Sequence, residues 1–175
     1  GRISKEKGVD KLIRIFENIP EASLYLAGKI ENDVAVMNSA KVKYLGFLNP
    51  TELEKEIRSA AFIVSTSRLP ETFGLIALEG MKAGRPFVGY NTGAYGEVVI
   101  NDKTGYLCDS EEELMEKIKK LATDEGLRIL FSRNSLEQAN KYDPDKYYLE
   151  ILDIFKTFAE KSKENSPLDF LRSIC

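Results

Sequence analysis

Residues 61–90 read AFIVSTSRLPETFGLIALEGMKAGRPFVGY, and the order of the segments in this stretch indicates the fold class. The nearly continuous apolar run over 61–65 predicts a central strand that helices cover on both faces. After it, the sequence predicts a loop over 66–71, a helix from about Phe73 to Lys82 that ends at Gly84, and a strand from Pro86 to Tyr90. Strand, loop, helix and strand in this order are typical of a parallel sheet.

The same alternation extends in both directions along the chain. Further strands are expected over 22–27, 42–47 and 105–108, and further helices over 9–19, 31–40, 110–121, 125–141, 144–159 and from about residue 50, where Thr51 and Glu54 have capping-box spacing. We therefore predict an α/β protein with a doubly wound parallel sheet. Such a sheet binds ligands at the carboxyl ends of its strands.

The composition excludes several classes of protein. The 25 basic and 28 acidic residues are interleaved, so no basic patch indicates nucleic-acid binding. No uncharged stretch approaches the roughly 18 residues that cross a bilayer, and no leader segment opens the chain, which favours a soluble, cytoplasmic protein. Cys108 and Cys175 are far apart, so we expect neither a disulfide framework nor a zinc site.

The sequence contains no histidine. This absence removes the usual general base, every Ser/His/Asp or Cys/His arrangement, and most zinc chemistry. Any catalysis must therefore use carboxylates, cations and backbone groups. The chain begins with Gly1 rather than Met, and we interpret it as a fragment of a longer protein.

Two glutamates, Glu71 and Glu79, are separated by seven residues. Glu71 precedes the predicted helix and Glu79 lies inside it, so both are near its positive N-terminal end. Gly74 lacks a Cβ, which lets an anion approach the amides of Phe73, Gly74 and Leu75. Both glutamates could be ordinary polar residues, but the apolar sequence around Glu79 favours a buried carboxylate with a specific partner.

A second cluster of charges lies in the glycine-flanked segment GRISKEKG, residues 1–8. It does not match the P-loop pattern. Arg2 can bind two phosphate oxygens at once, and Lys7 acts as a point charge. On its own this segment is also compatible with a solvated loop. Its predicted place at the same sheet edge as Glu71 favours anion binding.

Several blocks, in this order, resemble the C-terminal, nucleotide-sugar-binding half of a retaining glycosyltransferase of family 4. They are GRISKEKGVDKLI, LYLAG, VKYLGFL, ETFGLIALEGMKAGRPFVGYNTGAYGEVV and TGYL, followed by the helix containing Leu127 and Arg128. The resemblance runs from residue 1 to about residue 158. It implies a Rossmann-like domain, the C-terminal half of a GT-B fold, that transfers a hexose from a nucleotide diphosphate sugar.

The resemblance also implies roles for matching residues. Arg2 and Lys7 match the catalytic cations that neutralise the leaving nucleoside diphosphate, and Glu71 matches the catalytic glutamate beside the donor sugar. Donor-binding positions match Phe73, Gly74 and Leu75 at the helix start, Glu79 at the ribose hydroxyls, and Phe47 and Leu48 near the base. No metal and no cofactor are expected. The donor would be a UDP-, GDP- or ADP-sugar.

Two departures from the family pattern bear on these roles. Arg68 and Leu69 intervene between the strand end and Pro70, so the loop before Glu71 differs from the pattern. Ala94 and Tyr95 replace the smaller residues often found at their positions, which leaves the identity of the sugar open. The sequence Asp143-Pro144-Asp145 imitates the aspartate pair of metal-dependent glycosyltransferases. We interpret it instead as an N-cap and the first residues of a helix.

The resemblance predicts a donor-binding domain over 1–160, a tail over 161–175, and a missing N-terminal acceptor domain without which the chain is inactive. The acceptor, a lipid, a glycan or a small molecule, is not identified, and contact with the inner face of a membrane would occur through the missing half. A phosphorylase or epimerase of the same architecture is one alternative. A non-catalytic nucleotide-binding or interaction module is another.

Overall fold

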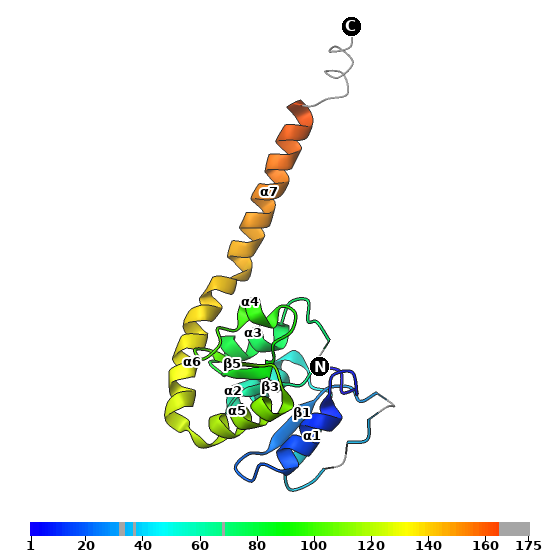
Figure 1. The fold of residues 1–175 in the computed structure, drawn as a ribbon. Coiled ribbons are helices and arrows are strands. Elements are labelled where there is room, and N and C mark those ends of the chain that lie inside the picture. Colours follow the sequence, from blue (N-terminus) through cyan, green and yellow to red (C-terminus); the bar gives the residue numbers. More distant parts are fainter. Residues whose placement is uncertain (32–33, 37, 68, 165–175) are drawn as a thin grey trace. The chain divides into compact units, whose positions relative to one another are not determined.

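The computed structural model describes residues 1–31, 34–36, 38–67 and 69–164 (Figure 1). The chain divides into two compact units, Gly1–Ala139 and Asn140–Cys175. The first unit contains every strand of the described residues, and the second contains the last helix. The predicted boundary at residue 160 stays a prediction.

All strand pairs in the first unit are parallel, which confirms the predicted sheet type. Strand β1 (Leu24–Ala27) pairs with β2 (Val42–Gly46), and a second sheet has the order β3-β4-β5. Its strands are β3 (Ile63–Ser65), β4 (Phe87–Tyr90) and β5 (Gly105–Cys108). The carboxyl ends of the strands within each sheet therefore lie at one edge.

Except between β1 and β2, helices alternate with these strands as the sequence predicts. Their bounds are α1 Val9–Glu17, α2 Pro50–Ser59, α3 Leu75–Lys82, α4 Tyr95–Val98, α5 Glu111–Thr123 and α6 Glu125–Ala139, followed by a short 3-10 helix Asn140–Tyr142 and α7 Pro144–Glu164. One core cluster joins α1 and α5 to β1 and β2, and it includes Val88 and Tyr90. Because side chains alternate along a strand, Phe87 points to the other face, where its ring contacts Tyr95.

The expectation that residues 61–65 form the central strand is wrong. Strand β3 lies at the edge of its sheet, and its residues are only half-buried, whereas every residue of β4 is buried between β3 and β5. The apolar run therefore predicts a strand here, but neither full burial of its two faces nor its position in the sheet.

The N-terminal residues connect the two sheets at the carboxyl ends of β1 and β3. The Ile3 N–H donates to the Lys29 carbonyl (2.9 Å), just beyond β1. The Thr66 hydroxyl, just beyond β3, contacts the carbonyl oxygens of Lys7 and Gly8 at 3.1 and 2.8 Å. The loop over residues 1–8 is therefore fixed beside both strand ends.

Two local predictions are also wrong. Residues 31, 34–36 and 38–40, the described part of the predicted helix over 31–40, are not helical. Helix α2 is capped by Asn49 and Glu52 rather than by Thr51 and Glu54: the Asn49 Oδ1 accepts from the Glu52 N–H (3.0 Å), and the Glu52 carboxylate accepts from the Asn49 N–H. Pro50 then occupies the first helical position, where its missing N–H is harmless.

The last helix, α7, begins at Pro144, and the Asp143 carboxylate accepts a hydrogen bond from the Asp145 N–H (2.9 Å). This contact supports the interpretation of Asp143 as a helix-start residue. The sequence predicts that this helix ends at residue 159, but the helix continues to Glu164. Residues 165–175 of the predicted tail lie outside the described residues. No helix in the described part of the chain is long and apolar enough to span a bilayer.

Cys108 is buried, and burial, assisted by the negative charge of Glu113, raises the pKa of its thiol to about 12. The thiol therefore stays protonated at pH 8, where an exposed cysteine is partly thiolate. In a Cys175→Ser variant, we expect Ellman's reagent to label native protein more than about a hundredfold more slowly than urea-unfolded protein. Rapid labelling of the native chain would contradict this burial.

Candidate active site

Helix α3 begins beside the loop that follows β3. Its N-cap, Gly74, has a left-handed backbone (φ 64°, ψ 32°), and Leu75 is the first helical residue. Phe73 and Leu75 are exposed, with 69% and 60% of their surface accessible. The first-turn N–H groups of a helix lack partners within the helix, so this end of α3 presents donors and a partial positive charge.

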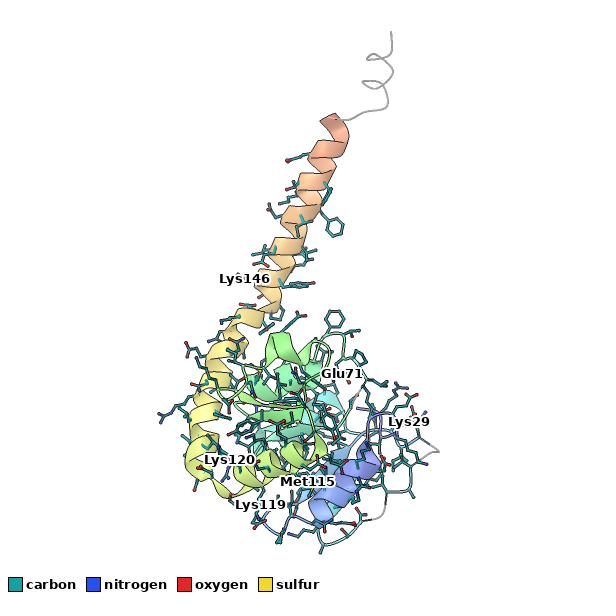
Figure 2. The ribbon with its side chains drawn as sticks, in the orientation of Figure 1. Lys29, Glu71, Met115, Lys119, Lys120 and Lys146 are labelled. Atoms are coloured by element: carbon teal, nitrogen blue, oxygen red, sulfur yellow. The ribbon has the colours of Figure 1, made fainter. Side chains whose placement is uncertain are left out.

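Glu71 lies in the same loop (Figure 2), and its carboxylate forms an ion pair with the Lys7 ammonium. The two side chains are 29% and 25% exposed, so the pair is partly shielded from water. The structure thus brings together two residues that the sequence separates by 64 positions. The contacts of Thr66 with the backbone of Lys7 and Gly8 fix the loop that carries the lysine.

The loop after β4 holds the backbone of Glu71. The Ala94 N–H donates to the Glu71 carbonyl (2.7 Å). Gly93 approaches so closely that a Cβ there would lie 2.4 Å from the Glu71 N and O atoms, and its φ is +55°. The motifs in the sequence predict no role for this loop. The Gly93 in its sequence was the available signal, because a turn with positive φ favours glycine.

Arg2 lies on the same N-terminal loop as Lys7 but is paired differently. Its guanidinium contacts the Glu31 carboxylate at 3.3 Å, and the two side chains are 60% and 37% exposed. An exposed pair of this kind contributes little, about 0–1 kcal/mol, to stability. The guanidinium can therefore exchange Glu31 for another anion at small cost.

Glu79 is exposed, so the expectation of a buried carboxylate is wrong. Helix α3 is covered on one side only, through Ala77, Gly80 and Met81, whereas Leu75 and Ile76 are accessible. Glu79 lines a groove between α2 and α3 with a volume of about 250 Å³. The other lining residues are Pro50, Leu53, Glu54, Ile57, Arg58, Lys82 and Ala83.

The predicted base-contacting residues, Phe47 and Leu48, follow β2 directly. Phe47 is 81% exposed and Leu48 is half-buried. Two residues further along, Pro50 opens α2 and lines the groove that also contains Glu79. The chain thus leads from these apolar side chains into one wall of the groove.

Tyr95 is the titratable group that the site perturbs most clearly. Its pKa is raised to about 12, mainly by burial; the hydrogen bond to Ser65 lowers it, and the negative charge of Glu71 raises it. The phenol is therefore neutral at physiological pH. Among the described residues, no group of three His, Cys, Asp or Glu side chains could hold a metal ion.

The family model "Glycosyl transferases group 1" matches residues 1–143. An uncharacterized glycosyltransferase of Methanocaldococcus jannaschii, MJ1178, is 31% identical over 169 residues, which cover 91% of this chain and 47% of that protein. The chain thus spans about half the length of this relative.

Solved structures show a similar fold. Anabaena Alr3699/HepE, in complex with UDP, superposes with a TM-score of 0.79 at 22% identity over 90% of this chain and 47% of its own. Sucrose-phosphate synthase from Thermosynechococcus elongatus gives a TM-score of 0.81 at 21% identity, over 93% of this chain and 45% of its own. The fold is therefore Rossmann-like, as in the C-terminal half of GT-B glycosyltransferases.

The position of Gly74 gives a direct test of the α3 start. A Cβ there would lie 3.3 Å from the Tyr95 ring, and the left-handed φ disfavours any other residue. We expect Gly74→Ala to lower the free energy of unfolding by about 1–3 kcal/mol, measured by urea denaturation.

Gly126→Ala is the matched control. Gly126 lies in α6, its backbone is not left-handed, and a Cβ would meet only an ordinary contact at 3.5 Å. This change should leave stability unchanged or raise it by up to about 1 kcal/mol. Equal losses for both variants would refute the described geometry at Gly74.

Proposed function

Because the chain belongs to the group 1 glycosyltransferases, we propose that it is the donor-binding half of an enzyme that transfers a hexose from a nucleoside diphosphate sugar. The transfer retains the anomeric configuration. The remaining half of the longer protein binds the acceptor, which is a lipid, a glycan or a small molecule. The observation that carries this proposal is the Lys7–Glu71 pair in the loop before α3.

Breaking the bond between the sugar carbon and the diphosphate places negative charge on the leaving oxygens and positive charge on the sugar ring. The ammonium of Lys7 and the first-turn amides of α3 stabilise the negative charge on the leaving oxygens, and Arg2 adds a second cation. The carboxylate of Glu71 stabilises the positive charge on the sugar ring. These groups already supply the charge that the step needs, so we propose transfer without a metal or cofactor.

Donor binding requires Lys7 to change partners. In this structure the Lys7 ammonium forms an ion pair with the Glu71 carboxylate, and the Arg2 guanidinium forms one with the Glu31 carboxylate. A diphosphate carries more negative charge than one carboxylate, so it competes for both cations. Once Lys7 moves to the phosphates, the Glu71 carboxylate becomes available to the sugar.

The groove between α2 and α3 accommodates the nucleoside in this proposal. Its wall includes the Glu79 carboxylate, which can accept hydrogen bonds from both ribose hydroxyls, and the apolar side chain of Leu53. Phe47 and Leu48 lie just before this wall and provide surface for the base. The UDP and UDP-glucose complexes of HepE support a nucleotide ligand for this fold.

Calorimetric titration with UDP, GDP and ADP tests the proposal. We expect one of them to bind the wild-type chain, and Lys7→Ala to weaken that binding by about 10- to 100-fold, because a charge-assisted hydrogen bond contributes about 1.5–3 kcal/mol. Lys119→Ala, at an exposed lysine on α5, is the matched control and should bind like wild type (Figure 2). EDTA should leave binding unchanged. Equal affinity of the Lys7→Ala and wild-type chains would contradict the assigned site.

A further inference from the structure

The loop that carries Glu71 has both of its ends against one buried side chain. We call residues 66–73, described apart from residue 68, the Glu71 loop. It begins after Ser65, the last residue of β3, and ends at Gly74, the N-cap of α3. Tyr95, at the start of α4, is 1% exposed and contacts the residues that flank both ends of this loop.

At the first end, the Tyr95 hydroxyl donates a hydrogen bond to the Ser65 Oγ at 3.2 Å. The same oxygen accepts from the Ser67 N–H at 3.4 Å, so it also fixes the first turn of the loop. Removing the tyrosine hydroxyl would therefore free the serine side chain that orients the exit from β3.

At the second end, the Tyr95 ring lies against Gly74. A Cβ built on Gly74 would be 3.3 and 3.6 Å from the ring atoms Cδ1 and Cε1. The ring also packs against the ring of Phe87, with the two centroids 4.7 Å apart and the ring planes tilted by 39°. Phe87 belongs to the buried strand β4, so the ring transmits the position of a rigid strand to the start of α3.

Between the two ends, a third contact fixes the loop: the N–H of Ala94, the residue before Tyr95, donates to the Glu71 carbonyl. We propose that Tyr95 is a positioning residue, whose hydroxyl and ring together set where the Glu71 carboxylate and the first turn of α3 meet the donor. This inference rests on the proposed donor-binding function. It assigns Tyr95 no contact with substrate.

The test compares ligands that differ only at the outer phosphate: UDP and UMP, or the corresponding guanine or adenine pair if the titration selects it. Tyr95→Phe keeps the ring and removes the hydroxyl. We expect it to weaken diphosphate binding about 3- to 10-fold, as loss of one hydrogen bond of about 0.5–1.5 kcal/mol predicts, and to change monophosphate binding less than twofold.

Two further variants separate positioning from general stability. Ser65→Ala should lose at least as much as Tyr95→Phe, because it also removes the acceptor of the Ser67 N–H. The double variant should lose no more than Ser65→Ala alone, because the bond that Tyr95→Phe removes is then already absent. Tyr106→Phe, at a buried tyrosine of β5, is the control and should leave the ratio of the two affinities unchanged. Equal losses for diphosphate and monophosphate, or additive losses in the double variant, would overturn the proposal.

Amide hydrogen exchange decides the question even if the wild-type chain binds no nucleotide. In that case the proposed function fails, but Tyr95→Phe should still speed exchange over residues 66–75 by about the same 3- to 10-fold, with exchange in β4 unchanged. Unaltered exchange over 66–75 would overturn the positioning role by itself.

Discussion

The whole site depends on one ion pair, between Lys7 at the N-terminal end of the chain and Glu71 after β3. It can form because the strands within each sheet are parallel and their carboxyl ends share one edge. Residues 1–8 lie at that edge, held at the end of β1 by Lys29 and at the end of β3 by Thr66. A partly shielded pair of opposite charges at this position presents a cation that a stronger anion can capture.

The surroundings of the pair are built for close backbone approach. Gly74 lets α3 begin against the Tyr95 ring, and Gly93 lets the next loop touch the Glu71 backbone. Each of these contacts uses a backbone conformation that other residues adopt poorly. The carboxylate therefore stands on a rigid support, while its lysine partner has a flexible side chain. This contrast suits a site in which the lysine side chain moves to a new partner while the glutamate stays in place.

The sequence predicted those features that depend on periodicity and on the order of elements. The parallel α/β fold followed from the alternation of segments, and the meeting of Lys7 with Glu71 followed from the shared edge. The exposure of Glu79 could not be predicted, because the composition of α3 does not say which of its faces another element covers. The edge position of β3 could not be predicted for a similar reason. The positioning role of Tyr95 could not be predicted either, because it depends on contacts between residues distant in sequence.

The most direct measurement is a crystal structure of the chain with the nucleoside diphosphate that it binds most tightly. We expect the Lys7 ammonium to have left Glu71 and to lie within hydrogen-bond distance of a phosphate oxygen at the N-terminus of α3, with the nucleoside in the groove beside Glu79. A structure in which Lys7 remains on Glu71 while the nucleotide binds elsewhere would contradict this expectation.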